Sequence, residues 1–264
     1  MRRAATFLAA AAAALTLAQG SAEAAGRAPA APQIVQVDPF GDALRDAQAA
    51  DGTAVGLSRL LEANRWSNWL LPRDAAAKYA TAAAHLHDPI AAAFARYARL
   101  RLLHAAGSPE AAAAEEELGF VQDWWVIGPF PNHGNDGLSN GMAPDAGFDE
   151  TALVPGSVVP VRWRDLERSS ETGYMDLKQR VFPNASAVVY AAAGLDVTSA
   201  GGADLWLAVD GSYRLWLDGK PLLEQKSHLG GFFMRDKVHV ELTAGQHTLT
   251  LKVAAADSAL GMHV

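Results

Sequence analysis

The sequence contains no cysteine. This absence excludes disulfides, thiolate metal sites, a cysteine nucleophile and lipid attachment through an N-terminal cysteine. The sequence also lacks the serine elbow of α/β-hydrolases, the His-Glu-x-x-His zinc motif, the Walker phosphate loop and the Gly-x-Gly-x-x-Gly dinucleotide loop. No spacing of carboxylates singles out an acid/base pair. The sequence therefore offers no catalytic residue and no cofactor-binding motif of these kinds.

Basic residues are outnumbered and scattered. The chain has 22 lysines and arginines against 29 aspartates and glutamates, which gives a net charge of −7. Nucleic acids and anionic membrane surfaces are bound by clustered positive charge. Because the chain has no basic run, its composition argues against both as partners.

The longest apolar run lies at the start of the chain. Arg2 and Arg3 precede the run Ala4–Leu17, and small residues follow at Ala22 and Ala24. This order of positive charge, apolar core and small residues is typical of a secretory signal peptide. The run is shorter than the ~20 residues of a membrane-spanning helix. We therefore predict a signal peptide at 1–25, export to the periplasm or the cell exterior, and no transmembrane anchor after cleavage.

Residues 40–118 predict a domain of helical hairpins, preceded by a flexible Ala/Pro-rich lead-in at 26–39. Asp88 followed by Pro89 is a strong start signal, because aspartate caps a helix and proline suits its first position. Apolar side chains then recur every three or four residues and predict a buried stripe: Ile90, Phe94, Tyr97, Leu100, Leu103. A similar apolar pattern predicts the second helix of the domain: Leu57, Leu60, Leu61, Trp66. Short breaks between the helices predict antiparallel neighbours.

Residues 119–264 predict an antiparallel β-sandwich of the jelly-roll type, so the fold class is α+β. Apolar and polar residues alternate in about seven or eight runs, as strands with one buried face require. Asp218-Gly219 predicts a two-residue hairpin. Gly245-Gln246 predicts a second hairpin, which would place Leu242 opposite Leu249, and by similar reasoning Leu207 is expected to face Leu215.

The first strand and the C-terminal end of this β-region are each marked by a sequence feature. The segment Asp123–Phe130 is expected to be its first strand, with one of the adjacent residues Trp124 and Trp125 inside the sandwich and the other against the helices. Gly128-Pro129 is expected to end the pairing of this strand. The chain stops at Val264 within a predicted strand, so we expect the native sandwich to continue beyond it.

Two loops hold the candidate binding residues. His228, Phe232 and Phe233 combine aromatic and polar groups beside glycines, which makes them candidates for sugar stacking. The favoured interpretation is that Phe232 and Phe233 cover a sandwich end or that one of them begins the next strand. The loop 132–140 is rich in oxygen ligands, and Asn135, Asp136 and Asn140 are its candidate calcium ligands. The loop lacks the spacing of an EF-hand, so an ordinary turn-rich loop is the favoured interpretation.

The β-region resembles modules of large exported bacterial proteins. The resemblance rests on short motifs in a common order: Trp124–Phe130, Gly147–Asp149, Trp163-Arg164, Gly173–Leu177, Leu215–Lys220 and Leu242–Gly245. It is similar to the galactose-binding-like or PA14-like jelly rolls attached to exported glycosidases. It is also similar to the N-terminal region of exported proteins that carry tetratricopeptide and transglutaminase-like segments, and the helices at 40–118 fit this second group better.

The sequence and the resemblance together favour an exported, non-catalytic binding or scaffold module that contacts glycan or an envelope protein. The alternative is an N-terminal accessory region of a larger exported enzyme, transglutaminase-like or a glycoside hydrolase, with its catalytic part beyond residue 264. A purely structural role in the cell envelope is a third interpretation.

Overall fold

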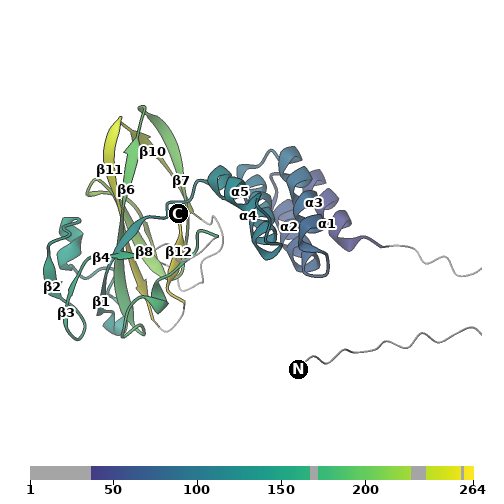
Figure 1. Ribbon diagram of the computed structural model, residues 1–264. Helices are drawn as coiled ribbons and strands as arrows, with labels where there is room; N and C mark the ends of the chain where they lie inside the picture. Colours follow the sequence, from purple (N-terminus) through teal and green to yellow (C-terminus); the bar gives the residue numbers. More distant parts are fainter. Residues whose placement is uncertain (1–36, 167–171, 227–235, 257–258) are drawn as a thin grey trace, which may run out of the picture. The chain divides into compact units, whose positions relative to one another are not determined.

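The computed structural model describes residues 37–166, 172–226, 236–256 and 259–264. Five helices come first in the chain and antiparallel β-sheets follow, which confirms the predicted α+β class (Figure 1). The predicted signal peptide and nearly all of the lead-in lie outside the described residues. Within the described part of the chain, no helix is long and apolar enough to cross a membrane.

The helical region consists of hairpins joined by short breaks. Its helices are α1 (Pro39–Ala49), α2 (Ala54–Ser67), α3 (Pro72–His85), α4 (Pro89–Ala105) and α5 (Ala111–Leu118). The Asp88 carboxylate accepts a hydrogen bond from the Ala91 amide at 2.8 Å, so the predicted cap of α4 is confirmed. Thr53 caps α2 in the same way, through its hydroxyl and the Gly56 amide at 3.2 Å.

Small side chains make up most of the helical core. Ala47, Ala63, Ala75 and Ala95 are fully buried, and the larger Tyr79 packs edge-on against another ring of the same core. Alanine lets helices approach closely, which leaves little room for large residues between them. Trp66 accordingly does not lie in this core, because 39% of its surface is exposed.

The β-region contains two main sheets and a separate hairpin. The six-stranded sheet has the order β4-β1-β6-β11-β8-β9, the four-stranded sheet has the order β10-β7-β12-β5, and β2 pairs with β3. The strands are β1 (Trp124–Pro131), β2 (Leu153–Pro155), β3 (Pro160–Arg162), β4 (Arg164–Leu166), β5 (Met175–Asp176), β6 (Ala187–Val197), β7 (Gly201–Val209), β8 (Ser212–Leu217), β9 (Lys220–Gln225), β10 (Asp236–Leu242), β11 (Gly245–Ala255) and β12 (Gly261–His263). Three short 3₁₀ turns lie between them: η1 (His133–Asn135), η2 (Ala143–Ala146) and η3 (Leu177–Gln179).

One of the two predicted hairpins is confirmed and the other is wrong. Leu217 pairs with Lys220 across Asp218-Gly219, and both turn residues have positive φ, 51° and 73°, as a type I′ turn requires. At Gly245 the chain instead passes from one sheet to the other. Strand β10 pairs with β7, whereas β11 pairs with β6 and β8.

The expected facing of Leu207 and Leu215 is wrong for the same reason. Leu207 pairs with Asp236 in the four-stranded sheet, and Leu215 pairs with Leu251 and Leu223 in the six-stranded sheet. Alternation predicts which residues of a strand face the core. It does not specify the neighbouring strand, because a two-residue connection permits either a hairpin or a change of sheet.

The two adjacent tryptophans of β1 lie on opposite faces of the six-stranded sheet. Trp124 is fully buried in the sandwich core, as expected for one of the pair. Trp125 faces the other side and packs against Phe148, with 5.9 Å between ring centroids. The expected contact of the second tryptophan with the helices is therefore wrong, because part of the segment between β1 and β4 covers this face. Pairing of β1 with β6 also resumes at Phe130 after a register shift, so Gly128-Pro129 does not end it.

A buried charge network lies on the same outer face. Lys252 of β11 has no exposed surface, and its Nζ donates to the Asn140 carbonyl at 2.8 Å and lies 3.3 Å from Asp145 Oδ2. The hydroxyl of Tyr190 donates to Asp145 Oδ1 at 2.7 Å. The network thus fastens the loop that precedes η2 to the middle of the sheet.

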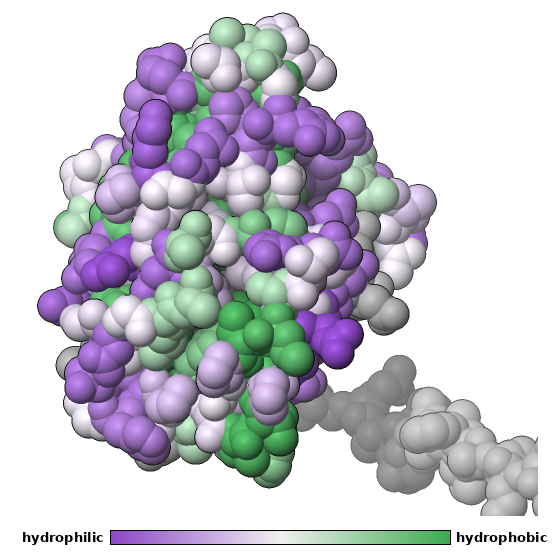
Figure 2. All heavy atoms as spheres, turned by 90° about the vertical axis from the view of Figure 1, so that its left-hand side faces the viewer, coloured by the Kyte–Doolittle hydropathy of each residue, from purple (hydrophilic) through white to green (hydrophobic). Residues whose placement is uncertain are grey.

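The β2–β3 hairpin carries apolar surface into solvent. Figure 2 shows the face on which this hairpin lies, with strongly hydrophobic surface gathered in its lower half. In and beside the hairpin, Leu153, Val158 and Val159 expose 61%, 74% and 62% of their surface.

Candidate functional site

The predicted sugar-stacking residues His228, Phe232 and Phe233 lie outside the described residues. The structure therefore places none of them, and their role stays a prediction.

The candidate calcium ligands share one exposed loop after β1. Asn135 has a φ of 62°, and the side-chain amide of Asn140 donates to Asp136 Oδ1 at 3.1 Å. The Asn140 carbonyl accepts a hydrogen bond from Lys252 Nζ at 2.8 Å. Among the described residues, no group of three or more His, Cys, Asp or Glu side chains is placed to hold a metal ion. The loop's own polar groups thus already hydrogen-bond to one another and to the sheet, and calcium binding there stays a prediction.

A hollow that combines aromatic and charged groups lies along α2. Its volume is about 550 Å³. The lining side chains recur at helical spacing along one face of α2 and just past its end: Ser58, Leu61, Glu62, Arg65, Trp66 and Trp69. The opposite face of the same helix carries the buried small residues that pack into the core, among them Ala63 and Ser67.

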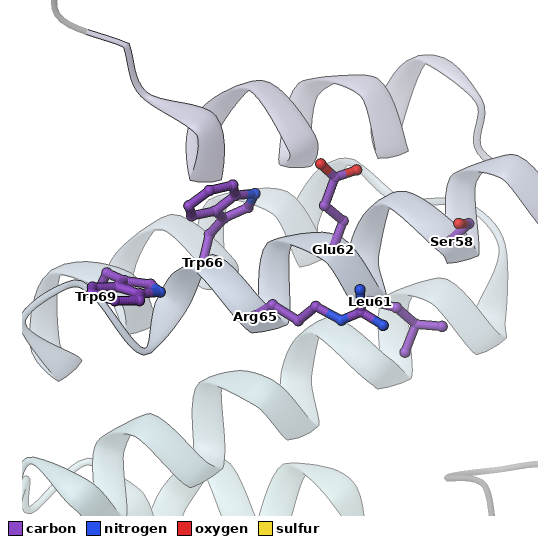
Figure 3. Close-up of a pocket in the computed structure, with 6 residues that line it drawn as sticks. All are labelled: Ser58, Leu61, Glu62, Arg65, Trp66 and Trp69. Carbon is purple, nitrogen blue, oxygen red and sulfur yellow. The ribbon is translucent and has the colours of Figure 1, made fainter.

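Two tryptophans give this hollow its aromatic surface. Trp66 exposes 39% of its surface and Trp69, beyond the end of the helix, exposes 83%. Figure 3 shows Glu62 and Trp66 pointing to one side of the α2 axis and Arg65 and Leu61 to the other, with Trp69 at one end. An exposed tryptophan face keeps both its apolar area and its electron-rich π-surface available to a ligand.

The carboxylate of the hollow is already held in place. Arg59 Nη1 donates to Glu62 Oε2 at 2.6 Å, and its Nε lies 3.8 Å from Asp46 of α1. The hydrogen bond from Arg59, with weaker help from the Trp66 indole, lowers the pKa of Glu62 below its ordinary value. Glu62 is therefore ionised at neutral pH and fixed on the side of the helix that faces α1.

Arg65 is the positively charged residue of the hollow. Its guanidinium makes no hydrogen bond or ion pair with any residue that the structure describes, and it acts on Glu62 only through its field. In Figure 3 its side chain runs along the helix toward Leu61, away from the Glu62 carboxylate. The hollow therefore combines two aromatic faces, an aliphatic floor and, within the described part of the chain, one cation without a partner.

A second hollow, of about 510 Å³, lies between α3 and α4. Alanines form much of its lining, and Arg99 at its rim is paired with Glu110 and Glu117, each at 3.5 Å. Its lining residues include no aromatic side chain. It therefore offers less to a ligand than the hollow along α2.

Sequence reasoning missed the hollow along α2 because it used Trp66 only as part of the apolar pattern that predicts this helix. A signal was present in the sequence. Residues 58, 62, 65, 66 and 69 follow one helical face and include charges, whereas Leu60, Ala63 and Ser67 follow another with small or apolar residues. Charged residues on the tryptophan face indicate that this face, and not the other, meets water.

No protein-family model and no curated protein matches the sequence. Among solved structures, a similar chain is the β-glucosidase of Kluyveromyces marxianus in complex with glucose, 12% identical with a TM-score of 0.35, covering 53% of this chain and 16% of that one. The β-glucuronidase of Faecalibacterium prausnitzii is 12% identical with a TM-score of 0.33, covering 51% of this chain and 20% of that one. The α-xylosidase of Xanthomonas citri is 11% identical with a TM-score of 0.31, covering 53% and 13%.

These likenesses concern the fold alone. The chain spans at most 20% of the length of these three enzymes. At such identities and TM-scores the comparison carries no argument about activity.

Proposed function

We propose that this chain is an exported, non-catalytic binding module that contacts carbohydrate through the hollow along α2. The observation that carries the proposal is the pair of exposed tryptophans, Trp66 and Trp69, beside charged groups in a hollow of about 550 Å³. Sugars offer apolar C–H faces and a rim of hydroxyls. They are therefore matched by aromatic faces with a few polar side chains around them.

The surroundings of the hollow favour binding without large rearrangement. The rear face of α2 is fixed in the alanine-rich core, and Arg59 ties α2 to α1 through Asp46. A ligand that meets a surface held in this way loses little affinity to the ordering of the protein. Leu71, exposed by 72%, extends the apolar surface beyond Trp69.

Affinity gel electrophoresis with a panel of soluble polysaccharides tests the proposal. We expect at least one polysaccharide to retard the wild-type chain and the double variant Trp66→Ala, Trp69→Ala to lose at least about tenfold in affinity, as for the central residues of binding surfaces. Phe182→Ala is the matched control, since Phe182 is an aromatic residue of the β-region with 88% exposure. It should bind as the wild type does.

Two results would contradict the proposal. One is retardation of the double variant to the same extent as the wild type, which would place any sugar contact elsewhere. The other is loss of a protein partner, but of no polysaccharide, from the double variant. That outcome would assign the tryptophans to a protein interface.

A further inference from the structure

We infer that the hollow along α2 selects anionic sugars, in which a pyranose carries a carboxylate or a sulfate group, and that Arg65 binds this group. The inference rests on the proposed carbohydrate contact and adds the class of sugar. It begins from the difference between the two charged side chains of the hollow: one is neutralised within the protein and the other is not.

Glu62 does not oppose an anionic ligand strongly, because its charge is compensated. Its carboxylate lies 2.6 Å from Arg59, which holds its pKa below the ordinary value. In Figure 3 the carboxylate points away from the Arg65 guanidinium. A ligand that lies over Trp69 and reaches toward Leu61 therefore meets the guanidinium and not the carboxylate.

Arg65 has the chemistry that such a ligand needs. A guanidinium presents a planar set of donors that matches the two oxygens of a carboxylate or a sulfate, and these charge-assisted bonds are stronger than neutral ones. Several other arginines of the helical region are paired with carboxylates of the protein. Arg59 pairs with Glu62, and Arg96 pairs with Glu117 at 3.0 Å. The donors of Arg65, by contrast, meet no partner among the residues that the structure describes and lie beside the tryptophan surface.

Arg65 also lies in the last turn of α2, where a positive charge favours the helix dipole. This structural role concerns stability and does not distinguish an anionic sugar from a neutral one. The ratio of the two affinities therefore isolates the ligand contact.

The net charge of the chain makes that ratio informative. At −7 the protein repels a polyanion at long range, so unspecific attraction would not produce tighter binding of an anionic polymer. A preference for the anionic member of a matched pair reports a local cation. For an exposed ion pair we expect a preference of about fivefold.

The test compares polymers that differ only in charge. Polygalacturonate is set against its methyl ester, and dextran sulfate against dextran, with the wild-type chain, Arg65→Gln and Arg65→Lys. We expect the wild type to bind the anionic member of at least one pair about fivefold more tightly, and Arg65→Gln to reduce the ratio of the two affinities to about one. Arg65→Lys keeps the charge but loses the planar fork, so its ratio should lie between the two.

The two pairs distinguish a carboxylated from a sulfated sugar, and the outcomes separate the inference from the proposed function. A ratio of one in the wild type, or a ratio that Arg65→Gln leaves unchanged, overturns the inference, while loss of all binding in the double tryptophan variant still supports the carbohydrate site. Binding that survives removal of both tryptophans overturns the proposed site itself.

Discussion

Removal of the Asp145 carboxylate should destabilise the β-region more than removal of its buried partner. Lys252 Nζ lies 3.3 Å from this carboxylate and has no exposed surface of its own. At an effective dielectric constant of about 20, two unit charges at that distance attract each other by about 5 kcal/mol. Asp145→Ala removes this attraction, and Tyr190 loses the acceptor of its 2.7 Å hydrogen bond. Because the Asn140 carbonyl still accepts from Lys252 and water can enter at the partly exposed position 145, we expect a net loss of about 3 kcal/mol.

Lys252→Met removes the buried charge and leaves the Asp145 carboxylate in place. The carboxylate of Asp145 keeps its bonds from Tyr190 and from the Met142 amide at 2.9 Å, and a quarter of its side chain already meets solvent. Replacement of a buried charge by an apolar side chain of similar length is often neutral. We therefore expect a loss within about 1 kcal/mol, and the double variant Asp145→Ala, Lys252→Met should be more stable than Asp145→Ala alone.

Urea unfolding followed by tryptophan fluorescence measures these free energies. Burial lowers the pKa of Lys252, so its unfolded form binds more protons than its folded form above that lowered pKa. Stability lost in Asp145→Ala should therefore be regained as the pH rises toward the ordinary lysine value, since the neutral amine no longer needs a counter-charge. Equal losses in both single variants, or a double variant less stable than Asp145→Ala, would refute the reasoning.

Three further predictions concern separate parts of the chain. Burial lowers the pKa of His263 to about 4, so below pH 6.5 the unfolded chain binds more protons than the folded chain. The free energy of unfolding should therefore fall by about 3 kcal/mol between pH 6.5 and 4. Acid unfolding of the wild type and of His263→Gln measures this dependence on pH as the difference between the two. Gly219→Ala should cost about 1 kcal/mol because of its φ of 73°, whereas Gly194→Ala, in open space without a positive φ, should leave the melting temperature unchanged. Ala63→Leu should cost about 1–3 kcal/mol of stability through overpacking of the helical core. Trp69→Ala should change stability by less than about 0.5 kcal/mol. A larger loss of melting temperature in Trp69→Ala than in Ala63→Leu would contradict the assignment of the two faces of α2.

The helices could be predicted well because their signals are local. Asp88 and Pro89 act through bonds and dihedral angles within a few residues, so the sequence contains what is needed to place the start of α4. The two-residue turn at Asp218-Gly219 is local in the same sense. These features were expected from sequence and are present in the structure.

The pairing of strands could not be predicted, because it depends on residues far apart in the chain. Strand β10 alternates as a hairpin partner of β11 would, yet it pairs with β7. The inner faces of the two sheets share one core, so Val240 and Leu251 pack in the same cluster although their strands belong to different sheets. Alternation therefore predicted that both strands contribute to the shared core, but it did not predict which strand each of them pairs with.

The candidate site shows a different limit, which arises from the alanine-rich core. In most helices large apolar side chains mark the buried face, and the apolar pattern that predicts α2 includes Trp66. Here Ala63 and Ser67 face the neighbouring helices, and the close approach that these small residues allow leaves no space for an indole. Trp66 and Trp69 are consequently displaced to the outer face, beside Arg65. In this helix the charged neighbours of Trp66 therefore indicate its position better than its size does.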